Sequence, residues 1–400
     1  MFGSCRFAAT VALFATVAFV PSAFAADYVP DRVIVKFKPG TPQLKQAVVL
    51  TRAGAMETMG RIRGVGAKVV RVDGNEKEIA ARLERSSAVD YAEVDKILSA
   101  TATPNDSEFA DQWALDRILA PQGWSLAGLS AFPHYGGVKV GIIDTGIDRS
   151  HPEFSGRVSN CAQSTTMFMV GTGIRDGCAD VDGHGTMVAG ILGARANNGA
   201  GVAGVAFNSP LAICRALEDG LGRGSTSNVV NCLNWLRQKG AKVISMSFGG
   251  ASSDTLHTAV KNAWKNGYGS VLVAAAGNSG DYTKIYPASY EEVISVSATD
   301  VDDGHAGSNY NASVELSAPG VDILTTTRGG GYGTGSGTSA AAPYVAGVAA
   351  LMRQKYPGAQ AFHIRDGLNA TADDLGAAGR DSYFGFGRVN LCHAMDPAAC

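Results

Sequence analysis

The stretch VGIIDTGIDRSH, residues 140–151, ends an apolar run with an aspartate that could serve acid–base chemistry. Its tripeptide Asp144-Thr145-Gly146 is the one that aspartic proteases use to present a catalytic carboxylate. Those enzymes need two carboxylates that share one proton, and the chain contains only one Asp-Thr-Gly or Asp-Ser-Gly tripeptide. An aspartic protease is therefore disfavoured. A lone aspartate after a strand can also be a turn residue or a helix cap, so its role depends on its partners.

Three downstream residues have side chains suited to acyl transfer. His184 lies between two glycines in DGHGTMVAG, at the predicted start of a helix. Ser339 begins a predicted helix in GTSAAAPYVAGVAALM, with Pro343 expected in the first turn, so free N–H groups would face an oxyanion. Asn278 follows a buried strand in VAAAGNSG and could donate to the same oxyanion. Taken singly, each could be only a cap or turn residue.

Apolar strands that alternate with helices must position these four residues. From about Gln112 onward the sequence predicts strands at 137–144, 211–217, 241–248, 270–277 and 293–299. Helical runs are predicted at 186–196, 227–240 and 254–267. This alternation is typical of a mostly parallel sheet covered by helices on both faces, with active sites at the carboxyl ends of the strands. We therefore predict an α/β domain.

A small α+β module precedes this domain. It has the pattern strand (31–40), helix (76–89) and strand (90–100). The expected inward faces carry Val33, Val35 and Phe37 in the first strand and Ile79, Leu83 and Val89 in the helix. The stretch TATPNDSEF, residues 101–109, is polar and predicts a boundary.

Composition favours a globular protein and argues against several classes of function. The 400 residues are 46% apolar and 18% charged, which favours a large core over disorder. A net charge of −2 argues against nucleic-acid binding and against a basic membrane surface. We expect no membrane partner and a monomer.

The first 25 residues predict an export signal. Arg6 precedes an apolar run from Phe7 to Val20, and Ala23-Phe24-Ala25 has the pattern of a cleavage site. The run is too short for a transmembrane anchor, so we expect a secreted protein. Six cysteines remain after the signal, and proximity favours the pairs 161–178, 214–232 and 392–400 among fifteen possible pairings. These residues are Cys161, Cys178, Cys214, Cys232, Cys392 and Cys400.

Taken together and in this order, the motifs resemble those of subtilisin-family (subtilase, S8-type) serine proteases. The matching stretches are VGIIDTGID, DGHGTMVAG, SMSFGG, AAAGNSG and GTSAAAPYVAGVAAL, from about Gln112 to the C-terminus. The Asp-His-Ser order and an oxyanion-binding asparagine are known features of subtilisin itself. The resemblance implies a three-layer αβα fold in which Ser339 is the nucleophile, His184 the base, Asp144 its orienting carboxylate and Asn278 the oxyanion donor.

The N-terminal module resembles the inhibitor-type propeptide of this family. The resemblance implies an intramolecular chaperone and inhibitor at residues 26–100, cleaved near Ala100 by the peptidase domain at 101–400. The alternative is a permanent domain with its own role.

The resemblance also implies a substrate cleft that binds proteins or peptides. Two wall segments and an edge segment match, and Ile285 is expected at the pocket floor. The residues are Ser247, Phe248, Gly249, Ala275, Ala276, Gly277, Gly222, Arg223, Gly224 and Ile285. Because the walls carry no carboxylate, an apolar or aromatic side chain is expected at P1, the residue before the cleaved bond.

Calcium is implied by partial matches to the family's ion-binding loop. The expected ligands are Asp106, Glu153, Asn198 and the carbonyls of Ala196, Ala200 and Val202. Oxygen ligands of this kind suit Ca²⁺, although many members have Asp at the position of Glu153. A solvated loop is the alternative. A second ion at Asp176, Asp180 and Asp182 competes with a simple turn.

Two other classes of function remain as alternatives. One is a catalytically inactive binding protein on the same fold, against which the retention of all four site residues argues. The other is a structural or adhesive surface protein, for which repeats or an anchor would be expected.

Overall fold

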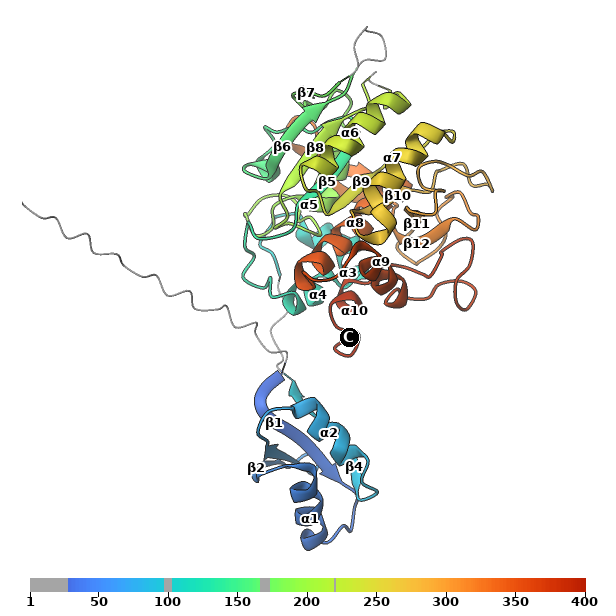
Figure 1. Ribbon diagram of the computed structural model, residues 1–400. Coiled ribbons are helices and arrows are strands. Elements are labelled where there is room, and N and C mark those ends of the chain that lie inside the picture. The colour runs from blue at the N-terminus through green and yellow to red at the C-terminus, as the bar shows by residue number, and fades with distance from the viewer. Residues whose placement is uncertain (1–27, 97–102, 166–172, 219–220) are drawn as a thin grey trace, which may run out of the picture. The chain divides into compact units, whose positions relative to one another are not determined.

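The computed structural model describes residues 28–96, 103–165, 173–218 and 221–400, which form two compact units, Met1–Leu98 and Ser99–Cys400 (Figure 1). The predicted export signal and the predicted cleavage near Ala100 lie outside the described residues. No helix in the described ranges is both long and apolar enough to cross a membrane.

The N-terminal unit is an antiparallel sheet with two helices. Its strand order is β2-β3-β1-β4. The elements are β1 (Tyr28–Phe37), α1 (Gln43–Ala53), β2 (Glu57–Ile62), β3 (Ala67–Arg71), α2 (Glu76–Glu84) and β4 (Val89–Lys96). Val33 and Val35 are buried with Ile79 and Leu83 of α2, as predicted. Val89 belongs to β4 instead of the helix, because α2 ends at Glu84.

Three elements of this unit were not predicted: α1, β2 and β3. Every residue of β2 is exposed or half-buried, so this strand shows no apolar alternation that a sequence pattern could reveal. The sheet is completed by tertiary pairing of β3 with β1.

The C-terminal unit is built on an eight-stranded sheet of order β12-β11-β10-β9-β5-β8-β6-β7. All neighbours are parallel except the β6–β7 pair. The strands are β5 (Val140–Asp144), β6 (Val158–Gln163), β7 (Arg175–Asp176), β8 (Leu211–Arg215), β9 (Val243–Met246), β10 (Val271–Ala275), β11 (Ile294–Thr299) and β12 (Val314–Pro319). The predicted mostly parallel sheet is confirmed.

Helices cover both faces of this sheet (Figure 1). One core contains α5 (His184–Gly193) and the long α8 (Thr338–Lys355), and the other contains α6 (Thr226–Gln238) and α7 (Asp254–Trp264). The predicted αβα layering is therefore confirmed. The remaining elements are η1 (Phe109–Asp111), α3 (Trp113–Arg117), α4 (Ala120–Leu126), η2 (Pro152–Phe154), η3 (Lys265–Gly267), β13 (Ile323–Thr327), β14 (Gly331–Gly335), α9 (Ala361–Ala370) and α10 (Leu391–Met395).

Three disulfides form between the cysteine pairs that sequence proximity favoured. They join Cys161 to Cys178, Cys214 to Cys232 and Cys392 to Cys400. The second ties strand β8 to α6, and both of its cysteines are fully buried.

Removing the Cys214–Cys232 disulfide should lower the free energy of unfolding. With both cysteines replaced by alanine in a Ser339→Ala background, which prevents self-digestion, we expect a loss of about 3 kcal/mol because the unfolded chain regains loop entropy. Urea unfolding measures it. The Cys392→Ala/Cys400→Ala control removes a bridge of separation 8 instead of 18 and should cost less. Equal stability with and without the first bridge would contradict the expectation.

Candidate active site

A hydrogen-bonded Asp–His pair lies at the carboxyl end of β5. Asp144 is the last residue of that strand and is fully buried, and its Oδ1 lies 2.8 Å from His184 Nδ1. The same oxygen accepts the Thr145 N–H at 2.7 Å. The negative charge of Asp144 raises the pKa of His184 to about 9, against the opposing effect of burial. This arrangement orients the imidazole and stabilises its protonated form.

Glycines allow the helix that starts at His184 to approach the end of β5. A Cβ on Gly185 would lie 2.2 Å from the carbonyl oxygen of Gly146. Gly183 has φ of +120°, a conformation that other residues rarely adopt. The glycines on either side of His184 are therefore required by backbone geometry and by close packing.

Ser339 is the second residue of α8, where N–H groups have no acceptor within the helix. Its hydroxyl donates to the carbonyl of Ser247 at 3.0 Å, and the Ser247 hydroxyl donates to the carbonyl of Ser339 at 3.0 Å. Among the described residues, Ser339 forms no hydrogen bond to His184. Catalytic hydrogen bonds often tighten only when substrate is bound, so this geometry is compatible with a serine nucleophile.

Pro343 lies inside α8 and not in its first turn, so that prediction is wrong. Proline has no N–H to donate to the carbonyl four residues earlier, which here belongs to Ser339. The hydroxyl of Ser247 satisfies that carbonyl instead. The proline and Ser247 thus act together, a link between distant segments that no local pattern reveals.

The amide of Asn278 is oriented by its neighbour in space, Thr338. The Thr338 N–H and hydroxyl both donate to Asn278 Oδ1 at 2.9 Å. The Thr338 hydroxyl in turn accepts the Gly277 N–H at 3.2 Å. With Oδ1 used in this way, Nδ2 is left to donate to a bound oxyanion next to the start of α8. The sequence prediction did not include this role of Thr338.

The predicted pocket walls lie on either side of Ile285. Ser247, Phe248 and Gly249 follow β9, whereas Ala275, Ala276 and Gly277 end β10 and continue beyond it. A Cβ on Gly249 would lie 1.8 Å from Ile285 Cγ2, and one on Gly277 would lie 2.9 Å from Ile285 Cγ1. The isoleucine therefore occupies the space between the two segments, as a pocket floor would.

The predicted edge segment Gly222-Arg223-Gly224 is irregular backbone in the structure and not a strand. The Arg223 carbonyl accepts the Glu218 N–H at 2.8 Å, which holds the segment beside the chain that leaves β8. The segment is therefore not a preformed edge strand. Pairing in the manner of a strand would occur only with a bound, extended substrate peptide.

Two predicted calcium ligands form a buried pair of carboxylates. Asp106 accepts the N–H groups of Asn197 and Asn198, and Glu153 accepts the Asn198 side-chain amide at 2.8 Å and the Tyr332 hydroxyl at 2.8 Å. Burial, together with the charge of Asp106, raises the pKa of Glu153 to about 7 against the opposing effect of the hydrogen bonds from Tyr332 and Asn198. A hard cation would relieve this repulsion, so the oxygen-rich set fits Ca²⁺.

The backbone part of the predicted calcium set lies in the same loop. Ala196 and Val202 are fully buried, and Ala200 donates its N–H to Asn198 Oδ1 at 2.9 Å. The Asn198 amide presents nitrogen to Glu153 in this geometry, so calcium binding would require that amide to turn.

A second ion at Asp176, Asp180 and Asp182 was the alternative to a simple turn, and the structure favours the turn. Within the described ranges, no three His, Cys, Asp or Glu residues gather as a metal-binding group. The oxygens of Asp180 accept protein N–H and O–H groups instead. These donors occupy the oxygens that a cation would need, which explains why closely spaced aspartates in the sequence form a turn here.

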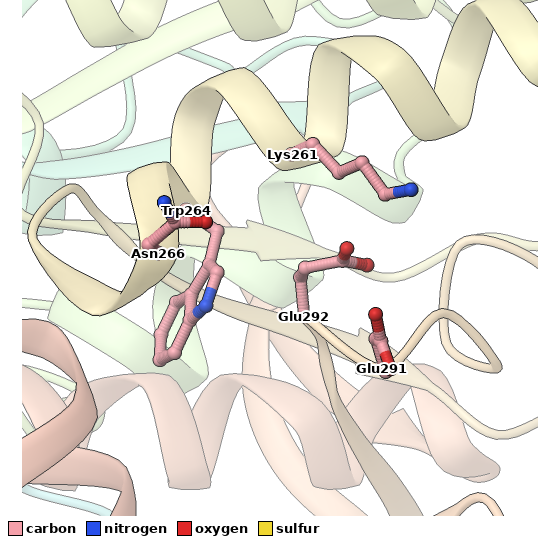
Figure 2. Close-up of a pocket in the computed structure, with 5 residues that line it drawn as sticks. All are labelled: Lys261, Trp264, Asn266, Glu291 and Glu292. Atoms are coloured by element: carbon pink, nitrogen blue, oxygen red, sulfur yellow. The ribbon is translucent and has the colours of Figure 1, made fainter.

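A separate pocket of about 480 Å³ lies near the amino ends of β10 and β11. Figure 2 shows Lys261, Trp264 and Asn266 from the end of α7 and the following turn, with Glu291 and Glu292 from the segment before β11. These segments lead into the amino ends of β10 and β11, whereas Asp144 is the carboxyl end of β5 and Asn278 follows that of β10. The pocket is therefore not part of the Asp144–His184 site.

Comparisons with known proteins agree with this geometry. The subtilase family matches residues 136–387, and the fervidolysin N-terminal prodomain matches residues 15–95. The thermophilic serine proteinase of Bacillus sp. (strain AK1) is 36% identical over 92% of this chain and 88% of its own length. Thermitase of Thermoactinomyces vulgaris is 38% identical over 73% of this chain and 99% of its own. Subtilisin DY of Bacillus licheniformis is 41% identical over 64% and 89%, respectively.

The subtilase match alone spans more than half of the chain, and the motifs that it covers contain the Asp–His pair described above. The protein therefore belongs to the subtilase family and is a subtilisin-like serine protease with an N-terminal prodomain.

Proposed function

We propose that the protein is a secreted serine endopeptidase that uses Asp144, His184 and Ser339 as its catalytic triad. The observation that carries this proposal is the 2.8 Å hydrogen bond between the buried Asp144 carboxylate and His184. It orients a base, and the resemblance of the GTSAAAPYVAG stretch to the family's serine motif supports Ser339 as the nucleophile.

In the proposed reaction, His184 takes the proton of the Ser339 hydroxyl while its oxygen attacks the scissile carbonyl carbon. The Ser339 hydroxyl first exchanges its bond to the Ser247 carbonyl for one to the imidazole. The tetrahedral intermediate then collapses, the C–N bond breaks and His184 returns the proton to the leaving amine. Water, activated by the same imidazole, hydrolyses the acyl-enzyme.

The negative oxygen of the intermediate is stabilised by the Asn278 amide and the backbone N–H of Ser339. The orientation of the amide by Thr338 supports this role. A donor that is held in place before the reaction costs no reorganisation when charge develops.

The protein is made as a zymogen in this proposal. Residues 1–25 direct export, and the prodomain inhibits the peptidase until cleavage near Ala100. The match of residues 15–95 to a prodomain family supports this order of events.

Calcium has a structural role in this proposal. Glu153, Asp106 and Asn198 would hold it with the carbonyls of Ala196, Ala200 and Val202. A bound ion would neutralise the two buried carboxylates and stabilise the loop, without taking part in the chemistry.

Self-processing predicts that Ser339→Ala accumulates as a precursor. The wild-type chain should release a fragment that ends near Ala100, because its own nucleophile performs the cleavage. Intact-mass spectrometry of both purified proteins measures the result. Phenylmethylsulfonyl fluoride provides an independent check, since it should modify only the wild type. Failure to modify Ser339 would favour the inactive binding protein, and release of the fragment by Ser339→Ala would contradict self-processing.

The pH profile should report the Asp144–His184 pair. His184 acts as a base only when neutral, so kcat/KM should rise with pH through its pKa, which Asp144 raises to about 9. Asp144→Asn should move this acid limb to lower pH and reduce kcat by about 10⁴. Asp254→Asn, at an exposed position on α7, is the matched control. An unchanged acid limb in Asp144→Asn would argue against the assignment.

Ile285→Gly should deepen the P1 pocket. Removing the side chain opens the space between Gly249 and Gly277, so the ratio of kcat/KM for Phe over Ala at P1 should rise by about tenfold. Ile285→Val should give a smaller change in the same direction. The measurement uses peptides that differ only at P1, and identical ratios in all three proteins would exclude Ile285 as the floor.

A further inference from the structure

We propose that Asp180 is a positioning residue that locks the strand end carrying Asp144 to the helix start carrying His184. The inference rests on the proposed triad and adds to it a residue outside that triad. It draws on the hydrogen bonds of one carboxylate that is 8% exposed.

The carboxylate of Asp180 accepts hydrogen bonds from both sides of His184 and from the residue next to Asp144. Its Oδ1 accepts the Thr145 hydroxyl at 2.8 Å and the Gly183 N–H at 2.9 Å. Its Oδ2 accepts the Thr186 N–H at 2.8 Å and also the Thr186 hydroxyl. One anion thus binds the segments that carry both members of the Asp–His pair.

Thr145 closes this network. Its hydroxyl donates to Asp180 and accepts the Gly185 N–H at 2.8 Å. Gly185 follows His184 directly, and Thr145 follows Asp144 directly. A second set of hydrogen bonds therefore lies beside the Asp144–His184 hydrogen bond and joins the same two segments. It runs from Thr145 to both Asp180 and Gly185.

The backbone before Asp180 is itself fixed. The Ile147 N–H donates to the Cys178 carbonyl at 2.8 Å, and the Asp180 N–H donates back to the Ile147 carbonyl at 3.3 Å. The Cys161–Cys178 disulfide ties the same segment to β6. Asp180 is thus fixed relative to the sheet, and its hydrogen bonds in turn fix the start of α5.

Asp180 stays ionised in this setting. Burial by itself would raise its pKa, but the hydrogen bonds from Thr186, Gly183, Asp182 and Thr145 outweigh burial and lower it. Its charge adds to those of Asp144 and Asp182 in raising the pKa of His184. The charged groups near this helix start are Asp144, Asp148, Asp180, Asp182, Arg215 and Arg328.

Asp180→Asn tests the inference on the processed enzyme. The amide can direct an NH₂ group at N–H donors and cannot accept all of their bonds. We expect kcat to fall by about tenfold to a hundredfold, the cost of misplacing a reactive group, with KM within about twofold. The acid limb of kcat/KM should also move to lower pH, since one charge near His184 is lost.

Glu315→Gln is the matched control. Glu315 is also a buried carboxylate, 4% exposed, and accepts bonds from Arg365 at 2.6 Å and Asn369 at 2.9 Å, away from the triad. Glu315→Gln should lower Tm and leave kcat and the acid limb unchanged. If Asp180→Asn likewise lowers only Tm, Asp180 is merely structural and the inference is overturned.

A second pair of variants decides the question if Asp180→Asn does not fold. Thr145→Val removes the bridging hydroxyl at nearly constant volume, whereas Thr145→Ser keeps it. We expect kcat to fall at least about tenfold in Thr145→Val and to recover in Thr145→Ser. Equal kcat in the two variants overturns the inference. Labelling of wild-type Ser339 by phenylmethylsulfonyl fluoride keeps this outcome separate from a failure of the proposed triad.

Discussion

The buried charge of Asp144 is the constraint on which the site depends. A carboxylate with no exposure at the end of β5 must be compensated. His184 and the Thr145 N–H do so at Oδ1, whereas Oδ2 is buried without a hydrogen-bond partner among the described residues. The hydrogen bond to His184 requires α5 to lie against the end of β5. This close approach requires glycine at position 185, which contacts the backbone of Gly146. The sheet supplies a rigid base for this pair, because β5 is flanked by β8 and β9.

Glycines are as important as side chains around the proposed P1 pocket and the start of α8. Gly249 and Gly277 leave the room that Ile285 fills, and Gly337 allows the approach of Asn278 to the start of α8, where a Cβ would lie 3.0 Å from Asn278 Nδ2. Close packing of this kind leaves little freedom for the groups that surround a bound peptide. The proposed P1 pocket and the proposed oxyanion site thus share one steric basis.

Asp180 and Glu153 are both buried carboxylates, but their surroundings differ. Asp180 is surrounded by N–H and O–H donors, and its pKa is lowered. Glu153 has fewer donors, so burial raises its pKa, and the charge of Asp106 contributes to the rise. The protein's own donors satisfy the carboxylate of Asp180, whereas the charges of Glu153 and Asp106 together would attract a cation. The spacing of acidic residues in the sequence does not distinguish these cases, because the difference lies in the donors that face each oxygen.

The sequence by itself determined the family, because the motifs that carry the resemblance are short stretches of chain. It also determined the parallel sheet with helices on both faces and the strand-end positions of Asp144 and Asn278, since apolar periodicity is a local property. Proximity also favoured the correct disulfide pairs. Only the tertiary structure decided that Ser247 satisfies the Ser339 carbonyl left free by Pro343, that Thr338 orients Asn278, and that Asp180 accepts hydrogen bonds from both Thr145 and Thr186. These contacts link residues far apart in the chain, and a hydrogen-bond partner is chosen by three-dimensional position.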